Sequence, residues 1–205
     1  MIEPEPHIVV FDVGRVIVQW DMRILLDRLY PDPSDADWAH ENVITRSWHG
    51  EHDAGRAIDT LVAERSASFP DHADAITAYR DRWLETIPGP VPGTIALIER
   101  LDAADVQLYA ITNFGSDFWR MFCPTQPVLK LFRDIVVSGD ESLVKPGRAI
   151  FDLAAQRFGR APDEMLFIDD TRANCETAAR LGWHTHHFTD ARTLETDLRG
   201  RGILA

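Results

Sequence analysis

Short, almost uninterrupted apolar segments recur along the chain, and they are rich in β-branched residues. They occupy residues 7–13, 106–112, 135–138 and 165–168, and a fifth strand is predicted at residues 183–188. Continuous rather than alternating hydrophobicity is typical of strands covered on both faces, as in a parallel sheet. Helical patterns occupy residues 94–103, 149–158, 172–181 and 191–199. This alternation predicts a doubly wound, Rossmann-like α/β fold with a parallel sheet of about five strands.

The region after the first apolar run has a different pattern. Between residues 21 and 85 no strand-like run occurs, and helix-compatible segments follow one another at residues 35–48, 56–67 and 72–85. Proline and glycine then crowd residues 88–93, which excludes a helix or a central strand there. We therefore expect an α/β core formed by residues 1–18 and 91–205. Residues 19–90, called the helical insert below, are expected to form a small cap inserted after the first strand.

Charge and composition narrow the class of partner. The net charge is −12 with acidic residues throughout the chain, so we expect no nucleic-acid partner. The apolar runs are far shorter than the roughly 20 residues that a membrane helix requires, so no membrane partner is expected. Residues 1–7 are polar and interrupted by proline, unlike a secretory leader, and the two cysteines, Cys123 and Cys175, lie far apart. These features predict a cytoplasmic protein.

Polar side chains follow the predicted strands. In open parallel sheets, ligands bind outside the carboxyl ends of the strands, where the strand order reverses. The candidates are Asp12, Gly14 and Arg15 after the first strand, Thr112 and Asn113 after the second, Lys145 after the third, and Asp169, Asp170 and Asn174 after the fourth. Lysine occurs at only one other position, Lys130, which adds weight to Lys145.

In order, spacing and residue type, these candidates resemble the haloacid dehalogenase-like hydrolase superfamily, whose members are mostly phosphatases with an aspartate nucleophile. The resemblance covers nearly the whole chain and implies a magnesium-dependent phosphohydrolase that acts on a small phosphorylated metabolite. It implies that Asp12 attacks phosphorus and becomes an aspartyl phosphate, which water then cleaves. Asp170 matches the metal-ligand position, and Asp169 is an acidic neighbour that is expected to bind the metal directly or through water. Asn174 matches a position that supports the metal ligands.

Electrostatics agrees with this resemblance. Two carboxylates about 4 Å apart repel by about 4 kcal/mol at an effective dielectric of 20, so Asp12, Asp169 and Asp170 require a positive partner. Mg²⁺ is a hard cation that prefers oxygen ligands and would also neutralise phosphate. We expect Lys145 to hold the phosphate or to pair with Asp12. The Thr112 hydroxyl and the Asn113 backbone N–H are expected to donate to phosphoryl oxygens.

Two residues depart from the family pattern. Most family phosphatases have a second aspartate, a general acid and base, where this chain has Gly14. Glycine still offers the metal its backbone carbonyl, but proton transfer, worth roughly 10²–10⁴ in rate, is lost. The form Phe-Asp-x-Gly resembles a branch that includes a bacterial glucose-1-phosphate phosphatase, which points to a sugar phosphate. The family usually has a small residue where this chain has Arg15, which is expected either to contact substrate or to point to solvent.

Two other functions fit parts of the pattern. A 2-haloacid dehalogenase shares the aspartate nucleophile and needs no metal, but such enzymes have serine and asparagine where this chain has Asp169, Asp170 and Thr171. They also have a tyrosine where this chain has Phe151. The second alternative is a weakly active or non-catalytic phosphate-binding homologue.

Histidine and tryptophan carry weaker signals. His184 and His186 share one face of a predicted strand and His187 the other, which argues against a metal cluster. His49 and His52 lie in the helical insert and are candidates to replace the acid missing at Gly14, although a polar helix end is the simpler interpretation. The six tryptophans are expected mostly to pack in the core: Trp20, Trp38, Trp48, Trp83, Trp119 and Trp183.

Overall fold

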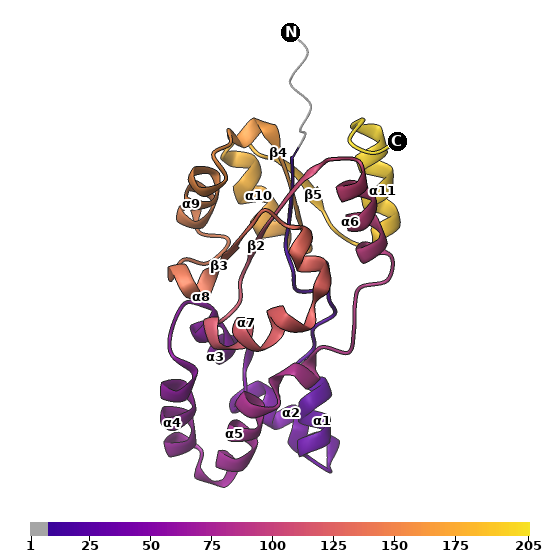
Figure 1. Ribbon diagram of the computed structural model, residues 1–205. Coiled ribbons are helices and arrows are strands. Elements are labelled where there is room, and N and C mark those ends of the chain that lie inside the picture. Colours follow the sequence, from indigo (N-terminus) through magenta and orange to yellow (C-terminus); the bar gives the residue numbers. More distant parts are fainter. Residues whose placement is uncertain (1–7) are drawn as a thin grey trace.

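The computed structural model describes residues 8–205. Residues 1–7 lie outside the described part. They include the first residue of the predicted first strand and the polar segment predicted not to be a secretory leader. Five parallel strands form the centre of the protein (Figure 1). They are β1 (Ile8–Phe11), β2 (Gln107–Thr112), β3 (Asp134–Val137), β4 (Met165–Asp169) and β5 (His184–His187). Their order is β3-β2-β1-β4-β5. The predicted doubly wound α/β fold is confirmed.

The strand order places β1 at the point where the chain changes direction. From β1 the chain moves outward through β2 to β3 and then returns to the other side of β1 as β4. Phe11 pairs with Ile168 of β4, so Asp12 and Asp169 follow neighbouring positions at the same edge of the sheet. Such a reversal in strand order is where open α/β sheets bind ligands.

Helices cover both faces of the sheet, which explains the continuous hydrophobicity of the strands. On one face lie α6 (Thr94–Ala103) and α11 (Ala191–Gly200), and on the other lie α9 (Arg148–Phe158) and α10 (Arg172–Arg180) (Figure 1). Along β1, Val9 and Phe11 join one apolar cluster, while Ile8 and Val10 join the other. Each residue of β1 is therefore buried whichever face it points to.

Five helices of the helical insert lie beyond the carboxyl ends of the strands (Figure 1). They are α1 (Arg23–Leu29), α2 (Pro33–Asn42), α3 (Arg46–Asp53), α4 (Ile58–Ser68) and α5 (Ala73–Asp81), and a 3₁₀ helix η2 (Trp83–Thr86) follows. The single helix predicted over residues 35–48 is wrong. Thr45 caps a new helix there, because its hydroxyl accepts a hydrogen bond from the Trp48 backbone N–H at 3.0 Å.

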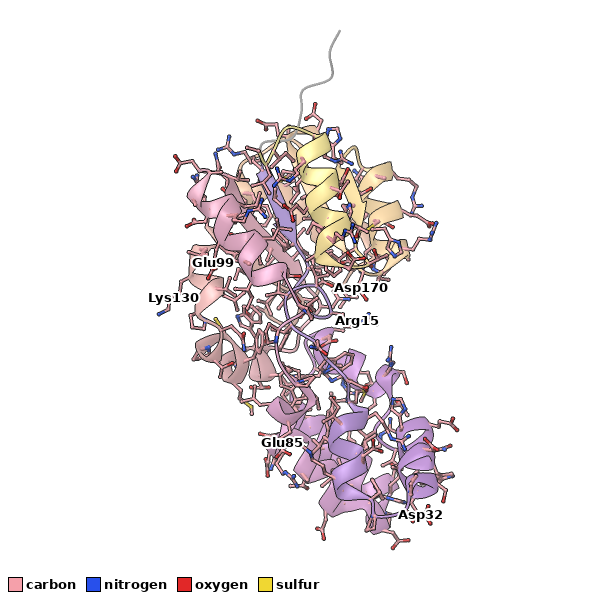
Figure 2. The ribbon with its side chains drawn as sticks, turned by 90° about the vertical axis from the view of Figure 1, so that its right-hand side faces the viewer. Arg15, Asp32, Glu85, Glu99, Lys130 and Asp170 are labelled. Atoms are coloured by element: carbon pink, nitrogen blue, oxygen red, sulfur yellow. The ribbon has the colours of Figure 1, made fainter. Side chains whose placement is uncertain are left out.

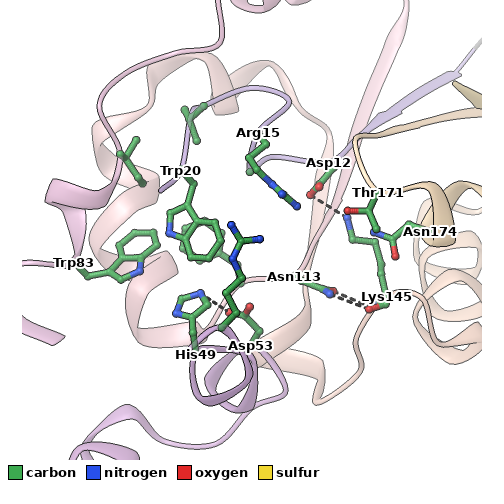
Figure 3. Close-up of a pocket in the computed structure, with 15 residues that line it drawn as sticks. Asp12, Arg15, Trp20, His49, Asp53, Trp83, Asn113, Lys145, Thr171 and Asn174 are labelled. Atoms are coloured by element: carbon green, nitrogen blue, oxygen red, sulfur yellow. Dashed lines mark hydrogen bonds and ion pairs between the residues drawn. The ribbon is translucent and has the colours of Figure 1, made fainter. Parts of the chain in front are cut away.

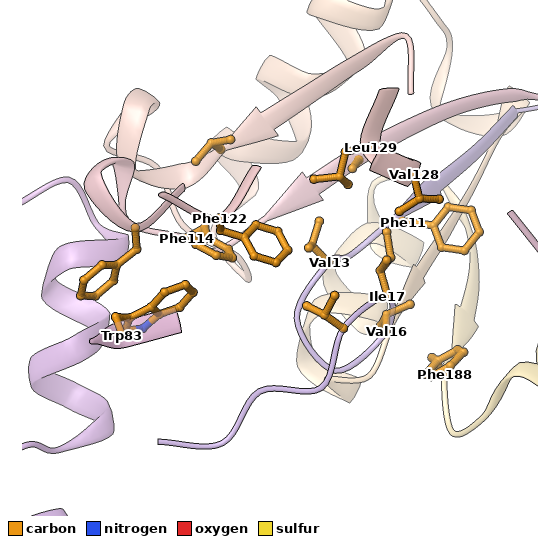
Figure 4. Close-up of a cluster of buried hydrophobic side chains, with 14 of the residues drawn as sticks. Phe11, Val13, Val16, Ile17, Trp83, Phe114, Phe122, Val128, Leu129 and Phe188 are labelled. Atoms are coloured by element: carbon orange, nitrogen blue, oxygen red, sulfur yellow. The ribbon is translucent and has the colours of Figure 1, made fainter. Parts of the chain in front are cut away.

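The two segments that join the helical insert to the sheet run side by side. The Gln19 N–H donates to the Gly89 carbonyl at 2.8 Å, and the Asp21 N–H donates to the Thr86 carbonyl at 2.9 Å. Apolar packing also continues between the two parts, since the Trp83 ring lies 5.1 Å from that of Phe114 (Figure 4). The predicted division into a core of residues 1–18 and 91–205 and an insert of residues 19–90 stays a prediction.

The remaining elements follow α4, β2, β3 and α9. They are α7 (Ser116–Phe122), α8 (Ser138–Glu141) and the 3₁₀ helices η1 (Pro70–His72), η3 (Cys123–Thr125), η4 (Pro127–Leu131) and η5 (Pro162–Glu164). Within residues 8–205, none of the helices combines the length and the apolar character needed to cross a bilayer.

Candidate active site

Asp12 lies where β1 ends and its carboxylate opens toward a cavity. Its backbone N–H still continues the sheet, because it donates to the Ile168 carbonyl at 2.8 Å. Its Oδ1 accepts from the Val13 N–H at 2.7 Å and lies 2.9 Å from the Lys145 Nζ. Between residues 8 and 205 no hydrogen bond reaches Oδ2. The Asp12 Oδ1 is therefore held by two partners, and Oδ2 is available to a ligand.

Lys145 lies between two carboxylates. It is 4% exposed, and its Nζ is 2.9 Å from Asp12 and 2.7 Å from Asp169. The side chain of Asn113 fixes its backbone, donating to the Lys145 carbonyl and accepting from its N–H, both at 2.9 Å. Burial lowers the pKa of Lys145, but attraction to Asp12 and Asp169 more than offsets this and raises the pKa above its usual value. Lys145 is thus a charged ammonium that faces Asp12.

Asp169 is enclosed, whereas Asp170 is partly open. The Asp169 carboxylate is fully buried and accepts hydrogen bonds from the Thr171 N–H at 2.7 Å and the Asn174 side chain at 3.0 Å, besides its pair with Lys145. The Asp170 side chain is 18% exposed. Asp169 therefore orients Lys145 and Asn174, and Asp170 keeps a more accessible carboxylate.

Arg15 has a partner that the sequence did not indicate. Its Nε lies 3.1 Å from Asp170 Oδ2, although its side chain is 43% exposed (Figure 2). The backbone of Arg15 has a φ of 59°, in the left-handed region that few non-glycine residues adopt. Arg15 therefore pairs with a carboxylate of the site, and its contact with substrate stays a prediction.

The three carboxylates together fit a divalent cation. Asp12, Asp169 and Asp170 each place an oxygen within 4.8 Å of the others. Burial raises the pKa of Asp12 to about 7, against the attraction of Lys145, and the pKa of Asp170 is also raised by burial. Neighbouring carboxylates add to these shifts, because Asp169 and Asp170 raise the pKa of Asp12 and Asp169 raises the pKa of Asp170. An all-oxygen donor set of this kind suits Mg²⁺.

A cavity of about 220 Å³ separates these strand ends from the helical insert (Figure 3). Predicted site residues form one wall: Asp12, Gly14, Arg15, Asn113, Lys145 and Asn174. In the part of the chain that the structure describes, Thr112, Asp169 and Asp170 do not line it. The Thr112 Oγ1 is buried and has no hydrogen-bond partner within residues 8–205, which leaves it able to donate to a ligand.

Apart from His49, which the sequence offered as a substitute for the acid missing at Gly14, sequence reasoning missed the opposite wall of the cavity. It includes Arg46, His49 and Asp53 of α3, together with Trp20 and Trp83. The spacing of the α3 residues, i, i+3 and i+7, places them on one helix face and was a signal in the sequence. The prediction that the tryptophans mostly pack in the core is confirmed, since five of the six belong to an apolar cluster or pack against one. Trp20 and Trp83 line the cavity, and Trp38 is 47% exposed.

The other histidines do not form a metal site. His186 pairs with Asp197 at 2.9 Å, and His187 bonds the Asp170 carbonyl at 3.0 Å. Over residues 8–205, the ligand side chains that lie close enough together to share an ion are those of Asp12, Asp169 and Asp170. His49 lines the cavity, whereas His52 is buried with its Nδ1 bonded to the Arg56 carbonyl.

Comparison with known proteins shows the family of the chain and supports its architecture. The family model described as haloacid dehalogenase-like hydrolase matches residues 9–182. The chain belongs to this family.

As a haloacid dehalogenase-like hydrolase it also has curated relatives. Acyl-CoA dehydrogenase family member 10 of Mus musculus is 33% identical over 102 residues, which are 49% of this chain but 9% of that protein. The chain thus spans only a small part of this relative's length.

A phosphatase is among the relatives of this hydrolase. Glyceraldehyde 3-phosphate phosphatase of Methanopyrus kandleri is 24% identical over 70% of the chain and 72% of its own length. A haloacid dehalogenase-family enzyme of Bacteroides thetaiotaomicron, crystallised as a magnesium complex, has a TM-score of 0.74 at 17% identity, covering 96% of this chain and 100% of that one. L-2-haloacid dehalogenase of Xanthobacter autotrophicus has a TM-score of 0.63 at 15% identity, covering 98% and 85%. The fold is therefore shared with a magnesium-bound enzyme of the family and with a dehalogenase.

Proposed function

We propose that this hydrolase is a Mg²⁺-dependent phosphatase of small phosphorylated metabolites that uses Asp12 as its nucleophile. The observation that carries the proposal is the convergence of Asp12, Asp169 and Asp170 within 4.8 Å beside the buried Lys145. A haloacid substrate carries its own carboxylate, which this concentration of negative charge would repel. A phosphate ester held with a divalent cation relieves the same repulsion.

Asp12, Asp170 and the Gly14 carbonyl would hold the cation, and Asp169 would keep Lys145 and Asn174 in place. A bound Mg²⁺ would act as a Lewis acid toward the phosphoryl oxygens. Asp12 Oδ2, which has no hydrogen-bond partner in residues 8–205, forms the bond to phosphorus as the leaving-group oxygen departs. Water then cleaves the aspartyl phosphate and regenerates the Asp12 carboxylate. Lys145 and the Thr112 hydroxyl supply positive charge and a hydrogen bond to the phosphoryl oxygens.

The size and walls of the cavity support a small substrate. A volume of about 220 Å³ lies below the range of about 300–1,000 Å³ that is usual for small-molecule sites, which favours a compact substrate. Aromatic rings of Trp20 and Trp83 and polar groups of His49 and Asp53 face this space. This combination suits a hydroxylated leaving group, and we propose sugar phosphates as the class to test first.

The test is a panel of phosphate esters, including sugar phosphates and acetyl phosphate, assayed with Mg²⁺ and with EDTA. Chloride release from 2-chloropropionate is measured in parallel. Phosphate release that requires both Mg²⁺ and Asp12 is expected, and Asp12→Asn serves as the matched control. Chloride release that resists EDTA would instead establish a dehalogenase, and inactivity in both assays would establish a non-catalytic binding protein.

A further inference from the structure

One face of α3 closes the cavity opposite the nucleophile. Arg46, His49 and Asp53 line it from the helical insert, and Asp12 and Lys145 line it from the strand ends (Figure 3). Because the cavity is small, a substrate whose phosphoryl group lies at Asp12 places its leaving group next to α3. The residue that meets the leaving-group oxygen is therefore expected on this helix.

His49 is held in one orientation by its neighbours. Its Nδ1 lies 2.9 Å from the Tyr79 Oη, and Tyr79 is fully buried. The ring packs between aromatic side chains, with its centroid 5.0 Å from that of Trp20 and 5.8 Å from that of Phe118. Its other nitrogen, Nε2, lies 3.5 Å from the Asp53 Oδ1. With Nδ1 engaged by Tyr79, Nε2 is the nitrogen left to exchange a proton.

The end of α3 is attached to the strand ends. The Ser138 hydroxyl donates to the Asp53 carbonyl at 2.6 Å and accepts from the Phe114 N–H at 2.9 Å. Phe114 directly follows Asn113, which fixes the backbone of Lys145. A chain of hydrogen bonds therefore connects α3 with the phosphate end of the cavity, and His49 keeps a defined position relative to Asp12.

We propose that His49 performs the proton transfer that the missing acidic side chain at Gly14 would otherwise perform, with Tyr79 and Asp53 as its positioning residues. The proposal rests on the phosphatase function proposed above. As the bond from Asp12 Oδ2 to phosphorus forms and the bond to the leaving oxygen breaks, the His49 imidazolium gives its Nε2 proton to that oxygen and becomes neutral. In the second step a water oxygen bonds to phosphorus, the bond to Asp12 breaks, and the water proton returns to Nε2.

The surroundings of His49 set the direction of its pH response. Burial lowers its pKa below the usual value, the nearby Asp53 carboxylate raises it, and His52 lowers it further. The titratable groups that face His49 are Asp53 and His52 from α3 and Tyr79 from α5, and burial raises the pKa of Tyr79 so far that its phenol stays protonated. Replacing Asp53 by asparagine therefore lowers the pKa of His49.

The experiment compares a substrate that needs leaving-group protonation with one that does not. His49→Gln is expected to lower kcat/KM for glycerol 3-phosphate by about 10²–10⁴, but for acetyl phosphate by less than about tenfold. His40→Gln, a histidine of α2 outside the cavity wall, is the matched control and should change neither value. An equal loss for both substrates, or no loss for either, overturns the proposal.

A second variant separates proton transfer from a structural role. An added Cβ at Gly14 meets no atom within 4 Å, so a side chain can begin there without a clash. Adding Gly14→Asp to the His49→Gln variant is expected to raise its kcat/KM for glycerol 3-phosphate at least tenfold. No recovery overturns the proposal. Asp53→Asn should move the alkaline limb of the pH profile to lower pH. Failure of the phosphatase function would look different, because no phosphate release from either substrate would then depend on Asp12.

Discussion

Replacing Lys145 by methionine keeps much of the side-chain volume but removes the ammonium that lies 2.9 Å from Asp12 and 2.7 Å from Asp169. Removing one partner from a buried ion pair costs about 3–5 kcal/mol, because it leaves the other charge buried and unpaired. For a chain of this length 1 kcal/mol shifts the Tm by about 2–4 °C, so the expected loss in EDTA is about 6–20 °C.

The assay is thermal and urea unfolding in EDTA, followed by circular dichroism. The exposed Lys130→Met is the matched control and should change the free energy of unfolding by less than about 0.5 kcal/mol. Adding Asp12→Asn to Lys145→Met removes one of the unpaired carboxylates and should recover about 0.5–3 kcal/mol. A loss below about 1 kcal/mol for Lys145→Met, or strict additivity of the two substitutions, would refute this account of the site.

Three further outcomes are expected. Arg15→Ala should raise the affinity for Mg²⁺ in calorimetric titration. The gain should be about fivefold at most, because the Arg15–Asp170 pair is partly exposed. Weaker binding would contradict this. Mg²⁺ should raise the Tm more at pH 8 than at pH 6. The reason is that the pKa of Asp12 is about 7, so the ion must displace a proton from Asp12 at the lower pH. Equal Tm shifts at the two pH values would argue against this. Gly115→Ala should cost about 1–3 kcal/mol in urea unfolding, because its Cβ would lie 1.9 Å from the His52 ring, whereas Gly50→Ala meets no atom and should cost nothing.

The strands and their polar ends were accessible from the sequence for a simple reason. A strand buried on both faces leaves a continuous apolar run, and the residue after the run lies at the edge of the sheet, as Asp12 does after β1. Neighbouring strands then bring Asp169 to the same edge through the pairing of Phe11 with Ile168. The candidate positions thus come together as predicted, while their roles in catalysis and metal binding remain proposals.

The helical insert was harder to predict because its apolar pattern continues across a break. Val43 and Ile44 are both buried and extend the helical pattern through the end of α2, whereas Thr45 starts a new helix. The cavity residues of α3 depend on contacts between distant parts of the chain, such as the hydrogen bond from Ser138 to the Asp53 carbonyl. The pairing of Arg15 with Asp170 likewise joins residues that no local pattern connects.

The covalent step at Asp12 can be measured directly. The hydrolase is mixed with ³²P-labelled acetyl phosphate and Mg²⁺, quenched with acid within milliseconds, and digested so that the labelled peptide is identified by mass spectrometry. We expect the label on the peptide that contains Asp12, and its absence both in EDTA and in Asp12→Asn. Label on another residue would contradict Asp12 as the nucleophile. So would phosphate release with no labelled protein, under conditions where hydrolysis of the aspartyl phosphate limits turnover.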